Sequence, residues 1–284
     1  MPAKDRINMD SLLPDAITAA KKAGDAVLEI YGSEFSVEQK EDRSPLTLAD
    51  KRSHEVIAGQ LKSGQAGRLP ILSEEGRNIP YEERKAWEYY WLVDPLDGTK
   101  EFIRRNGEFT VNIALMHKNR PVMGVVLLPV KDLLYFAAEG TGAFRLSGTS
   151  EIKKGIAPEE IKRKAISLTA IDKTAKRPYT VIASRSHMSE ETSSFIDAIR
   201  NEYGEIKIIS AGSSLKFCLV AEGTADIYPR FGPTMEWDTA AGQAIVELAG
   251  GSVHNHETDQ PLRYNKENLL NPWFIVRGPV PPQR

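Results

Sequence analysis

Six short apolar runs follow one another closely in the first half of the 284-residue chain. They cover residues 69–72, 89–93, 110–116, 122–128, 134–138 and 143–146. Turn-forming residues connect several of them, as at 119–121 and 130–132. Strands joined by such short connections pair as antiparallel neighbours, because a parallel pair needs a long crossover. The runs therefore predict a mostly antiparallel sheet.

Two amphipathic helices are predicted ahead of these runs. Residues 12–31 place apolar side chains at steps of three and four, with Pro14 near the start and Gly32 after the end. Residues 48–62 repeat the pattern, and a cap at Thr47 would put Asp50 in the first turn. Paired helices over a sheet make one α/β layer pair.

Strands and helices alternate in the last third of the chain. Expected strands cover 179–183, 206–210, 225–228 and 273–276, and expected helices cover 189–200, 213–222 and 239–248. The intervening segment is rich in lysine and glutamate, so we expect a solvated connection or a variable excursion there. We predict an α/β protein of alternating helix and sheet layers in two lobes. Its parts are an N-terminal metal-binding lobe (1–147), a connection (148–178) and a C-terminal substrate lobe (179–284).

The composition excludes several functional classes. A formal net charge of -2, with lysine and arginine dispersed among acids, argues against polymeric nucleic acid as a partner. No apolar run approaches the roughly 20 residues of a membrane span, so none is expected. Cys218 is the only cysteine, which rules out an internal disulfide. We expect a cytoplasmic protein, with peripheral attachment to the inner face of the cell membrane as the alternative.

The string WLVDPLDGTK, residues 91–100, carries the most chemical information. An apolar strand ends there in two acids, and Pro95 is expected to stop the strand ladder and leave the Leu96 carbonyl free. Asp94, Asp97 and that carbonyl can converge on magnesium, which prefers oxygen ligands. The alternative is a polar turn formed for conformational reasons alone.

Two further strings contain acids beside apolar segments. In LPILSEEG, residues 69–76, Glu74 and Glu75 follow a strand, although they could form a merely solvated pair. In WDTAAG, residues 237–242, Asp238 precedes a helix of small residues. Its alternative is a helix cap, although one aspartate can serve both purposes. Small residues would let this helix approach a backbone or ligand closely.

Together these strings resemble the inositol monophosphatase superfamily, whose signatures are Asp-Pro-Leu/Ile-Asp-Gly-Thr and a distal Trp-Asp-x-Ala-Ala-Gly. The likeness extends over roughly residues 50–251. It implies the sugar phosphatase fold, a phosphoric monoester hydrolase activity and two or three bound Mg2+ ions. The implied ligands of one ion are Glu74, Asp94 and the Leu96 carbonyl, and those of a second are Asp94, Asp97 and Asp238.

The resemblance also implies catalytic roles. The nucleophile would be a metal-activated water positioned by the Thr99 hydroxyl, with Asp50 and Glu74 orienting or deprotonating that hydroxyl. The backbone N–H groups of Gly98 and Thr99 would hold the phosphate. Asp50 has an alternative role as an acid that the dipole of its own helix favours.

Three strings in the last third resemble the bisphosphate nucleotidase branch: SRSH (184–187), GSSLKFC (212–218) and AEGTADIYPRFG (221–232). Arg230 stands where inositol phosphatases carry a glutamate, and with Lys216 it suits a second phosphate that stays bound. Lys216 could instead be a surface lysine. The implied substrate contacts are Asp97, Gly98, Thr99, His187, Ser213, Ser214, Lys216, Arg230 and Asp238. His187 could also be an ordinary loop histidine, and the two serines could only cap a helix.

The implied reaction is hydrolysis of 3'-phosphoadenosine 5'-phosphate to AMP and phosphate, which would connect the protein to sulfur assimilation and make it sensitive to lithium. The implied partner is thus a small bisphosphorylated nucleotide. Alternatives are an inositol monophosphatase or a fructose-1,6-bisphosphatase of the same superfamily, and a non-enzymatic nucleotide or metal sensor. The sequence leaves the oligomeric state open.

Overall fold

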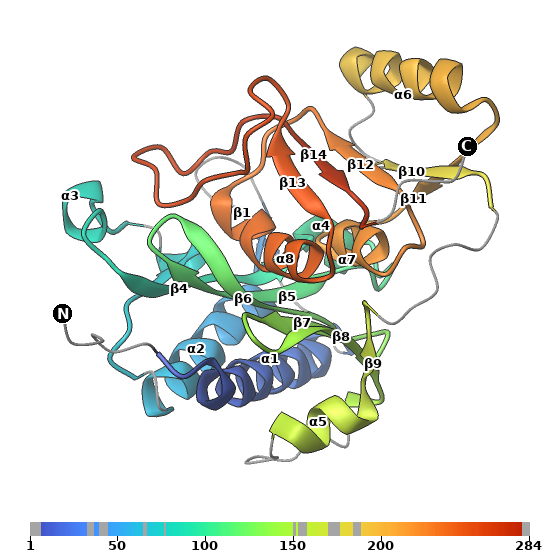
Figure 1. Ribbon diagram of the computed structural model, residues 1–284. Helices are drawn as coiled ribbons and strands as arrows, with labels where there is room; N and C mark the ends of the chain where they lie inside the picture. The colour runs from blue at the N-terminus through green and yellow to red at the C-terminus, as the bar shows by residue number, and fades with distance from the viewer. Residues whose placement is uncertain are drawn as a thin grey trace.

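Helix and sheet layers alternate through the molecule (Figure 1). Helices α1 (Met9–Tyr31) and α2 (Leu48–Ser63) cover one face of the larger sheet, and α7 (Leu215–Ala221) and α8 (Glu236–Leu248) lie between the two sheets. Helix α6 (Glu190–Tyr203) lies on the outer side of the smaller sheet. This arrangement confirms the predicted α/β class and its layers. The computed structural model describes residues 7–32, 37–39, 45–64, 67–76, 78–149, 152, 158–169, 177–183 and 189–279.

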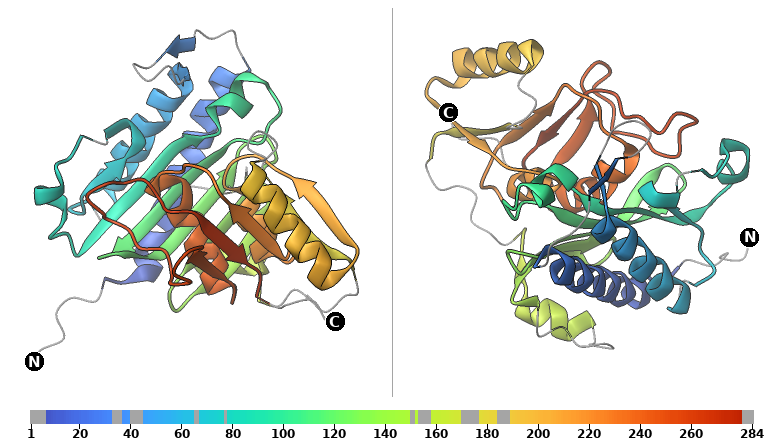
Figure 2. Two further views of the ribbon diagram at one scale, coloured as in Figure 1. Left: turned by 90° about the horizontal axis from the view of Figure 1, so that it is seen from above. Right: turned by 180° about the vertical axis from the view of Figure 1, so that it is seen from behind.

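The larger sheet has seven strands in the order β3-β4-β5-β6-β7-β8-β9. All neighbouring pairs are antiparallel except β3 with β4, which confirms a mostly antiparallel sheet. Short hairpin connections explain the antiparallel order. The strands are β3 (Ile71–Ser73), β4 (Tyr89–Asp97), β5 (Thr110–His117), β6 (Arg120–Leu128), β7 (Leu133–Ala138), β8 (Gly142–Ser147) and β9 (Ile166–Ser167). Seen from behind, α1 and α2 lie side by side beneath this sheet (Figure 2, right).

The smaller sheet has five strands in the order β11-β10-β12-β14-β13. Strand β10 runs parallel to both of its neighbours, whereas β14 is antiparallel to both of its own. The strands are β10 (Tyr179–Ala183), β11 (Ile206–Ser210), β12 (Ile227–Arg230), β13 (Ser252–Asn255) and β14 (Phe274–Arg277). The sequence did not predict β13, which is short and follows α8 after a turn at Gly250 in a left-handed conformation (φ 94°).

The segment predicted as a solvated connection or excursion is packed at some of its described residues and exposed at others. Helix α5 (Pro158–Lys164) and β9 lie within it, and β9 pairs with β8 of the larger sheet. Ile161 and Leu168 are buried, which shows that a few well-placed apolar residues suffice to anchor a charged segment. The division of the chain into two lobes stays a prediction.

The remaining elements are short. Strands β1 (Val37–Gln39) and β2 (Pro45–Thr47) pair with each other, η1 (Glu74–Gly76) is a single 3-10 turn, and α3 (Tyr81–Arg84) and α4 (Thr99–Ile103) are brief helices. Within the described ranges, no helix combines the length and apolarity needed to cross a bilayer.

Helix α8 packs very closely against its neighbours on both sides. A Cβ at Gly242 would lie 2.5 Å from a ring atom of Phe217 on α7. A Cβ at Gly124 on β6 would lie 2.3 Å from the Ala241 carbonyl oxygen. Glycine and alanine therefore let α8 approach both α7 and the larger sheet, as the small residues predicted. This packing fixes the first turn of α8, with Asp238, over the sheet.

Candidate active site

The two acids of the central string lie at the end of β4, on either side of a bulge. Asp94 pairs with Asn112 and Asp97 with Thr110 on β5, and the register shifts between these two pairs. The ladder thus resumes after Pro95, and the expectation that proline ends it is wrong. A bulge accommodates a residue without an N–H group and re-aims the neighbouring side chains.

An aromatic cluster holds the loop that follows β4. Gly98 has a left-handed conformation (φ 93°) and precedes α4. The rings of Tyr31, Phe102 and Phe109 lie 5.0 to 5.1 Å apart, and both phenylalanines are fully buried. Tyr31 belongs to α1, so packing between distant segments fixes the start of α4 and the Thr99 hydroxyl at its first position.

Two neighbouring elements bring further acids to the end of β4. Asp50 is completely buried in the first turn of α2, as predicted, and three residues later the Ser53 hydroxyl donates a hydrogen bond of 2.7 Å to the Pro95 carbonyl. Glu74 begins η1 directly after β3, whose Ser73 lies opposite Val93 in the parallel register. Glu74 therefore follows its strand at the same sheet edge as Asp94.

The carboxylates influence one another strongly. Burial raises the pKa of Asp94 well above its usual range, and the negative charges of Glu74, Asp97, Asp238 and Asp50 raise it further. The five acids predicted from separate strings thus converge on one place. Carboxylates this crowded cannot all ionise at neutral pH unless a cation neutralises them.

Asp238 caps its helix and also belongs to the acid cluster. Its Oδ2 accepts a hydrogen bond of 2.8 Å from the Met235 N–H and so caps α8. It lies in the first turn rather than ahead of the helix, which corrects the predicted start of α8. Burial, followed by the charge of Asp97, raises the pKa of Asp238 to about 8. Burial also raises the pKa of Asp97, although the charge of Lys216 opposes this effect.

The donor set fits magnesium by its chemistry, because it consists of carboxylate and carbonyl oxygens. In the described part of the chain, no group of three or more His, Cys, Asp or Glu side chains is arranged to hold an ion. The predicted ligands are Glu74, Asp94 and the Leu96 carbonyl for the first ion and Asp94, Asp97 and Asp238 for the second. These acids raise one another's pKa, which shows that they lie near one another.

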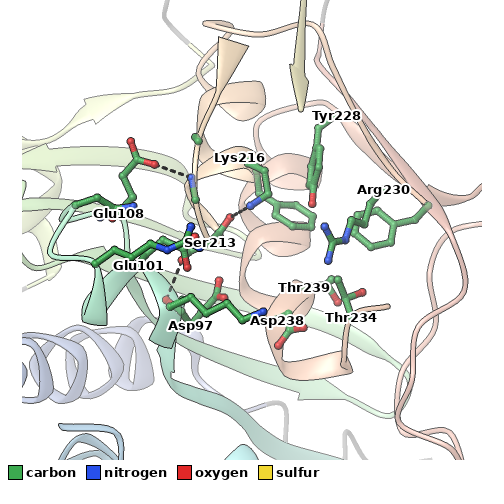
Figure 3. Close-up of a pocket in the computed structure, with 18 residues that line it drawn as sticks. Asp97, Glu101, Glu108, Ser213, Lys216, Tyr228, Arg230, Thr234, Asp238 and Thr239 are labelled. Atoms are coloured by element: carbon green, nitrogen blue, oxygen red, sulfur yellow. Dashed lines mark hydrogen bonds between the residues drawn. The ribbon is translucent and has the colours of Figure 1, made fainter. Parts of the chain in front are cut away.

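A cavity of about 330 Å³ adjoins these acids. Figure 3 shows Asp97 and Asp238 on one side of it, with Lys216, Tyr228 and Arg230 across from them. The walls come from α4, from the loop before α7, from β12 and from the start of α8. The acid cluster and the cations predicted to select the substrate therefore face the same space.

One contact ties the loop after β4 to the loop before α7. The Ser213 hydroxyl donates to the Asp97 carbonyl (2.8 Å), and Ser213 has an unusual left-handed backbone (φ 50°). A Cβ at Gly98 would lie 2.1 Å from that hydroxyl, so only glycine leaves room for it. The Gly212 N–H donates to Glu108 Oε2 (2.9 Å), which holds the second loop in place (Figure 3).

Ser214 also connects separate elements. It occupies the cap position of α7 but makes no side-chain capping bond. Its hydroxyl instead donates to the Asp238 carbonyl (2.9 Å) and accepts from Asn112 Nδ2 (3.0 Å). The alternative that both serines only cap a helix is therefore wrong.

Lys216 is buried, with 8% of its surface exposed, so the alternative of a surface lysine is also wrong. Its Nζ donates to the Ser213 carbonyl (2.6 Å) and lies 5.5 Å from the centre of the Tyr228 ring. Burial lowers the pKa of Lys216 to about 8, although Asp97 opposes this shift. Arg230, at the end of β12, donates from Nη2 to the Pro233 carbonyl (3.0 Å). His187 lies outside the described residues.

The structure adds cavity residues that the sequence analysis missed. Lys100, Glu101, Arg104 and Glu108 all line the cavity from the α4 side. The spacing of Lys100 and Arg104 could have revealed these two, because a helix that begins at Thr99 places residues four apart on one face.

The model of the inositol monophosphatase family matches residues 8–272. The chain belongs to that family. A protein of Salmonella typhimurium named 3'(2'),5'-bisphosphate nucleotidase CysQ is 44% identical over 268 residues, covering 93% of this chain and 99% of the relative. The protein of that name from Escherichia coli K12 is also 44% identical, with the same coverage. The crystal structure of CysQ from Bacteroides thetaiotaomicron has a TM-score of 0.87 and 48% identity, covering 97% of this chain and all of that one. Within the family, the chain lies in the CysQ branch.

Proposed function

We propose that the chain is a magnesium-dependent 3'(2'),5'-bisphosphate nucleotidase that hydrolyses 3'-phosphoadenosine 5'-phosphate to AMP and phosphate. The observation that carries the proposal is that Asp97 and Asp238 share one cavity with Lys216 and Arg230 and face them across it. Acids suit the cations that activate a phosphate ester, and buried cations suit a second anionic group. The CysQ relatives are named as 3'(2'),5'-bisphosphate nucleotidases, which supports the same activity.

Two or three magnesium ions belong to this proposal. Glu74, Asp94 and the Leu96 carbonyl would hold one ion, while Asp94, Asp97 and Asp238 would hold a second. When bound, the ions supply an activated water and neutralise charge on the phosphate. Asp94 would be shared, which agrees with its position at the centre of the mutually interacting acids.

The chain's own groups orient the reactants. The Thr99 hydroxyl positions the attacking water, and Asp50 with Glu74 accepts the proton that the water loses. Asp50 is buried beside Asp94, which supports this role. The N–H groups of Gly98 and Thr99 hold the phosphate while the bond from phosphorus to the 3' oxygen breaks. That oxygen leaves with a proton as the free hydroxyl of AMP.

The remaining cavity residues bind the leaving nucleotide. Lys216 and Arg230 would hold the retained 5'-phosphate, the former already oriented by Ser213 and the latter at the end of β12. Ser213, Ser214 and His187 complete the residues that we propose to contact the nucleotide. A cytoplasmic location and a role in sulfur assimilation follow from the same proposal.

A phosphate-release panel tests this function. The purified protein with magnesium is given adenosine 3',5'-bisphosphate, inositol 1-phosphate and fructose 1,6-bisphosphate. We expect the nucleotide to have a kcat/KM at least about 100-fold above the others. Inositol 1-phosphate has no second phosphate for the cations, and fructose 1,6-bisphosphate carries its second phosphate on a different skeleton. A preference for either sugar phosphate would identify one of the other phosphatases. Tight nucleotide binding without phosphate release would identify a sensor.

A further inference from the structure

Lys100 on α4 and Arg104 at the C-cap of this helix line the cavity but have no role in the proposed reaction. Lys100 and Arg104 are both exposed, and the Arg104 N–H donates to the Lys100 carbonyl (3.0 Å). Residues four apart on a helical turn share one face, so the two charged groups can reach the same anion. Both lie within five residues of Thr99 and line the same cavity as Asp97.

The four basic side chains that line the cavity differ in whether they are hydrogen-bonded to the protein. Lys216 donates to the Ser213 carbonyl, and Arg230 donates to the Pro233 carbonyl. By contrast, neither Lys100 nor Arg104 has a side-chain hydrogen bond or ion pair with any other described residue. Long, unrestrained side chains at a cavity rim can follow a group that extends toward solvent.

Acids face these two cations as well. Glu101 lies between them in sequence, and Glu108 lines the same wall, but Glu108 already accepts the Gly212 N–H. Asp97 and Asp238 lie deeper in the proposed metal site. The wall formed by α4 and the residues after it is therefore mixed in charge, and two of its three side chains without a hydrogen bond or ion pair to a described residue are basic: Lys100 and Arg104, beside Glu101.

We propose that Lys100 and Arg104 form an anion subsite on the α4 side of the cavity, which adds to Lys216 and Arg230 in binding the phosphate or sulfate group carried at C5' of the leaving nucleotide. The inference rests on the proposed nucleotidase function and extends it to two substrate-contacting residues. A lysine offers a mobile point charge and an arginine a planar pair of donors, which together suit a tetrahedral oxyanion. The subsite would make the enzyme favour substrates with an anionic group at C5'.

The kinetic test compares adenosine 3',5'-bisphosphate with adenosine 3'-monophosphate in Lys100→Gln, Arg104→Gln and the double variant. We expect kcat/KM for the bisphosphate to fall about 10-fold in each single variant, a typical effect of one charge-assisted hydrogen bond. The value for the monophosphate should stay within about 2-fold, because it has no anion at C5'. Equal losses on both substrates, or no loss on the bisphosphate, would overturn the subsite.

Lys118→Gln is the matched control. Lys118 is exposed and follows β5 (Thr110–His117) at the end away from the cavity, about 25 Å along the strand at 3.3 Å per residue. It should leave both substrates unaffected. If the wild-type protein itself shows no preference for the bisphosphate, the proposed function fails. If that preference exists and survives in the double variant, only the subsite fails.

Equilibrium binding identifies the group that is bound. AMP, the product, and adenosine 5'-phosphosulfate are titrated into the wild type and the double variant in the presence of magnesium. Equal losses of affinity of about 10-fold or more would assign the subsite to the phosphate on C5'. A larger loss for the phosphosulfate would assign it to the terminal sulfate. Unchanged affinity for both ligands would overturn the inference.

Discussion

The acid cluster (Asp50, Glu74, Asp94, Asp97 and Asp238) and the cationic wall of the cavity (Lys100, Arg104, Lys216 and Arg230) are built in different ways. Asp50 and Asp94 are 0% and 1% exposed and belong to elements that pack on the larger sheet. Among the cations, Lys216 is buried, Arg230 is only partly so, and Lys100 is exposed. The proposed chemistry thus rests on a cluster whose centre, Asp50 and Asp94, is fully buried, whereas the proposed substrate choice rests on groups that range from buried to exposed. Changes in the first region should therefore abolish turnover, and changes in the second should alter selectivity.

The largest effect is expected for Asp94→Asn. Asn has the same shape but removes the charge of the residue proposed to be shared by two ions. We expect kcat to fall at least about 1000-fold, or roughly 4 kcal/mol, at saturating magnesium. Thermal unfolding of the metal-free protein should not be destabilised, because the variant relieves repulsion among buried acids. Substantial activity in a folded variant would refute the shared-ligand role.

Arg230→Ala should affect one substrate class. For the bisphosphate we expect a loss of about 2 to 4 kcal/mol in transition-state binding, as for breaking a partly buried charge-assisted contact. Affinity for AMP should fall too. A substrate without the second phosphate should lose much less, which kcat/KM for the 3'-monophosphate would show. Equal losses on both substrates would mean that Arg230 is structural.

Asp238→Asn separates the metal role from the capping role of this residue. Asn keeps an oxygen that can accept the Met235 N–H, so α8 and the fold should survive. The magnesium concentration for half-maximal activity should rise about 10-fold, because a neutral amide is a weaker ligand than a carboxylate. A magnesium titration with thermal unfolding as the folding control tests this. Unchanged magnesium dependence would leave Asp238 as a cap alone.

Lithium should act on the acid cluster without affecting the cationic wall. We expect half-maximal inhibition below about 10 mM, where ionic strength changes little. Sodium at the same concentration is the control. The Arg230→Ala variant should keep the sensitivity of the wild type, since its change lies outside the proposed metal ligands. Insensitivity of the wild type at tens of millimolar would contradict replacement of a magnesium ion.

The smallest effect concerns the contact between the two loops. Glu108→Ala removes the acceptor of the Gly212 N–H and should lower kcat/KM for the bisphosphate about 5-fold, mainly through KM. Glu108→Gln keeps an oxygen acceptor and should stay within about 2-fold of the wild type. Rescue by Gln would distinguish the hydrogen bond from the charge. Equal losses in both variants would show that the charge of Glu108 matters instead.

The sequence by itself determined the longer helices, most of the strands and the identity of the acids. Periodic apolar residues predicted α1, α2 and most strands to within a few residues, because a buried face imposes its spacing on the chain. The acids were visible because each of Asp94, Asp97, Glu74 and Asp238 borders an apolar run. The resemblance to a family added their roles, which the structure leaves as proposals.

Only the tertiary structure decided which polar groups share a space and how far each is buried. The sequence left a surface lysine open as the alternative for Lys216, but packing of α7 against Tyr228 buries it. Pro95 reads as the end of a strand, but pairing of Asp97 with Thr110 continues the ladder beyond a bulge. Lys100 and Arg104 join the cavity only because α7 and α8 close it from the other side. Burial and proximity depend on contacts between distant segments, and local patterns in a single sequence carry no record of those contacts.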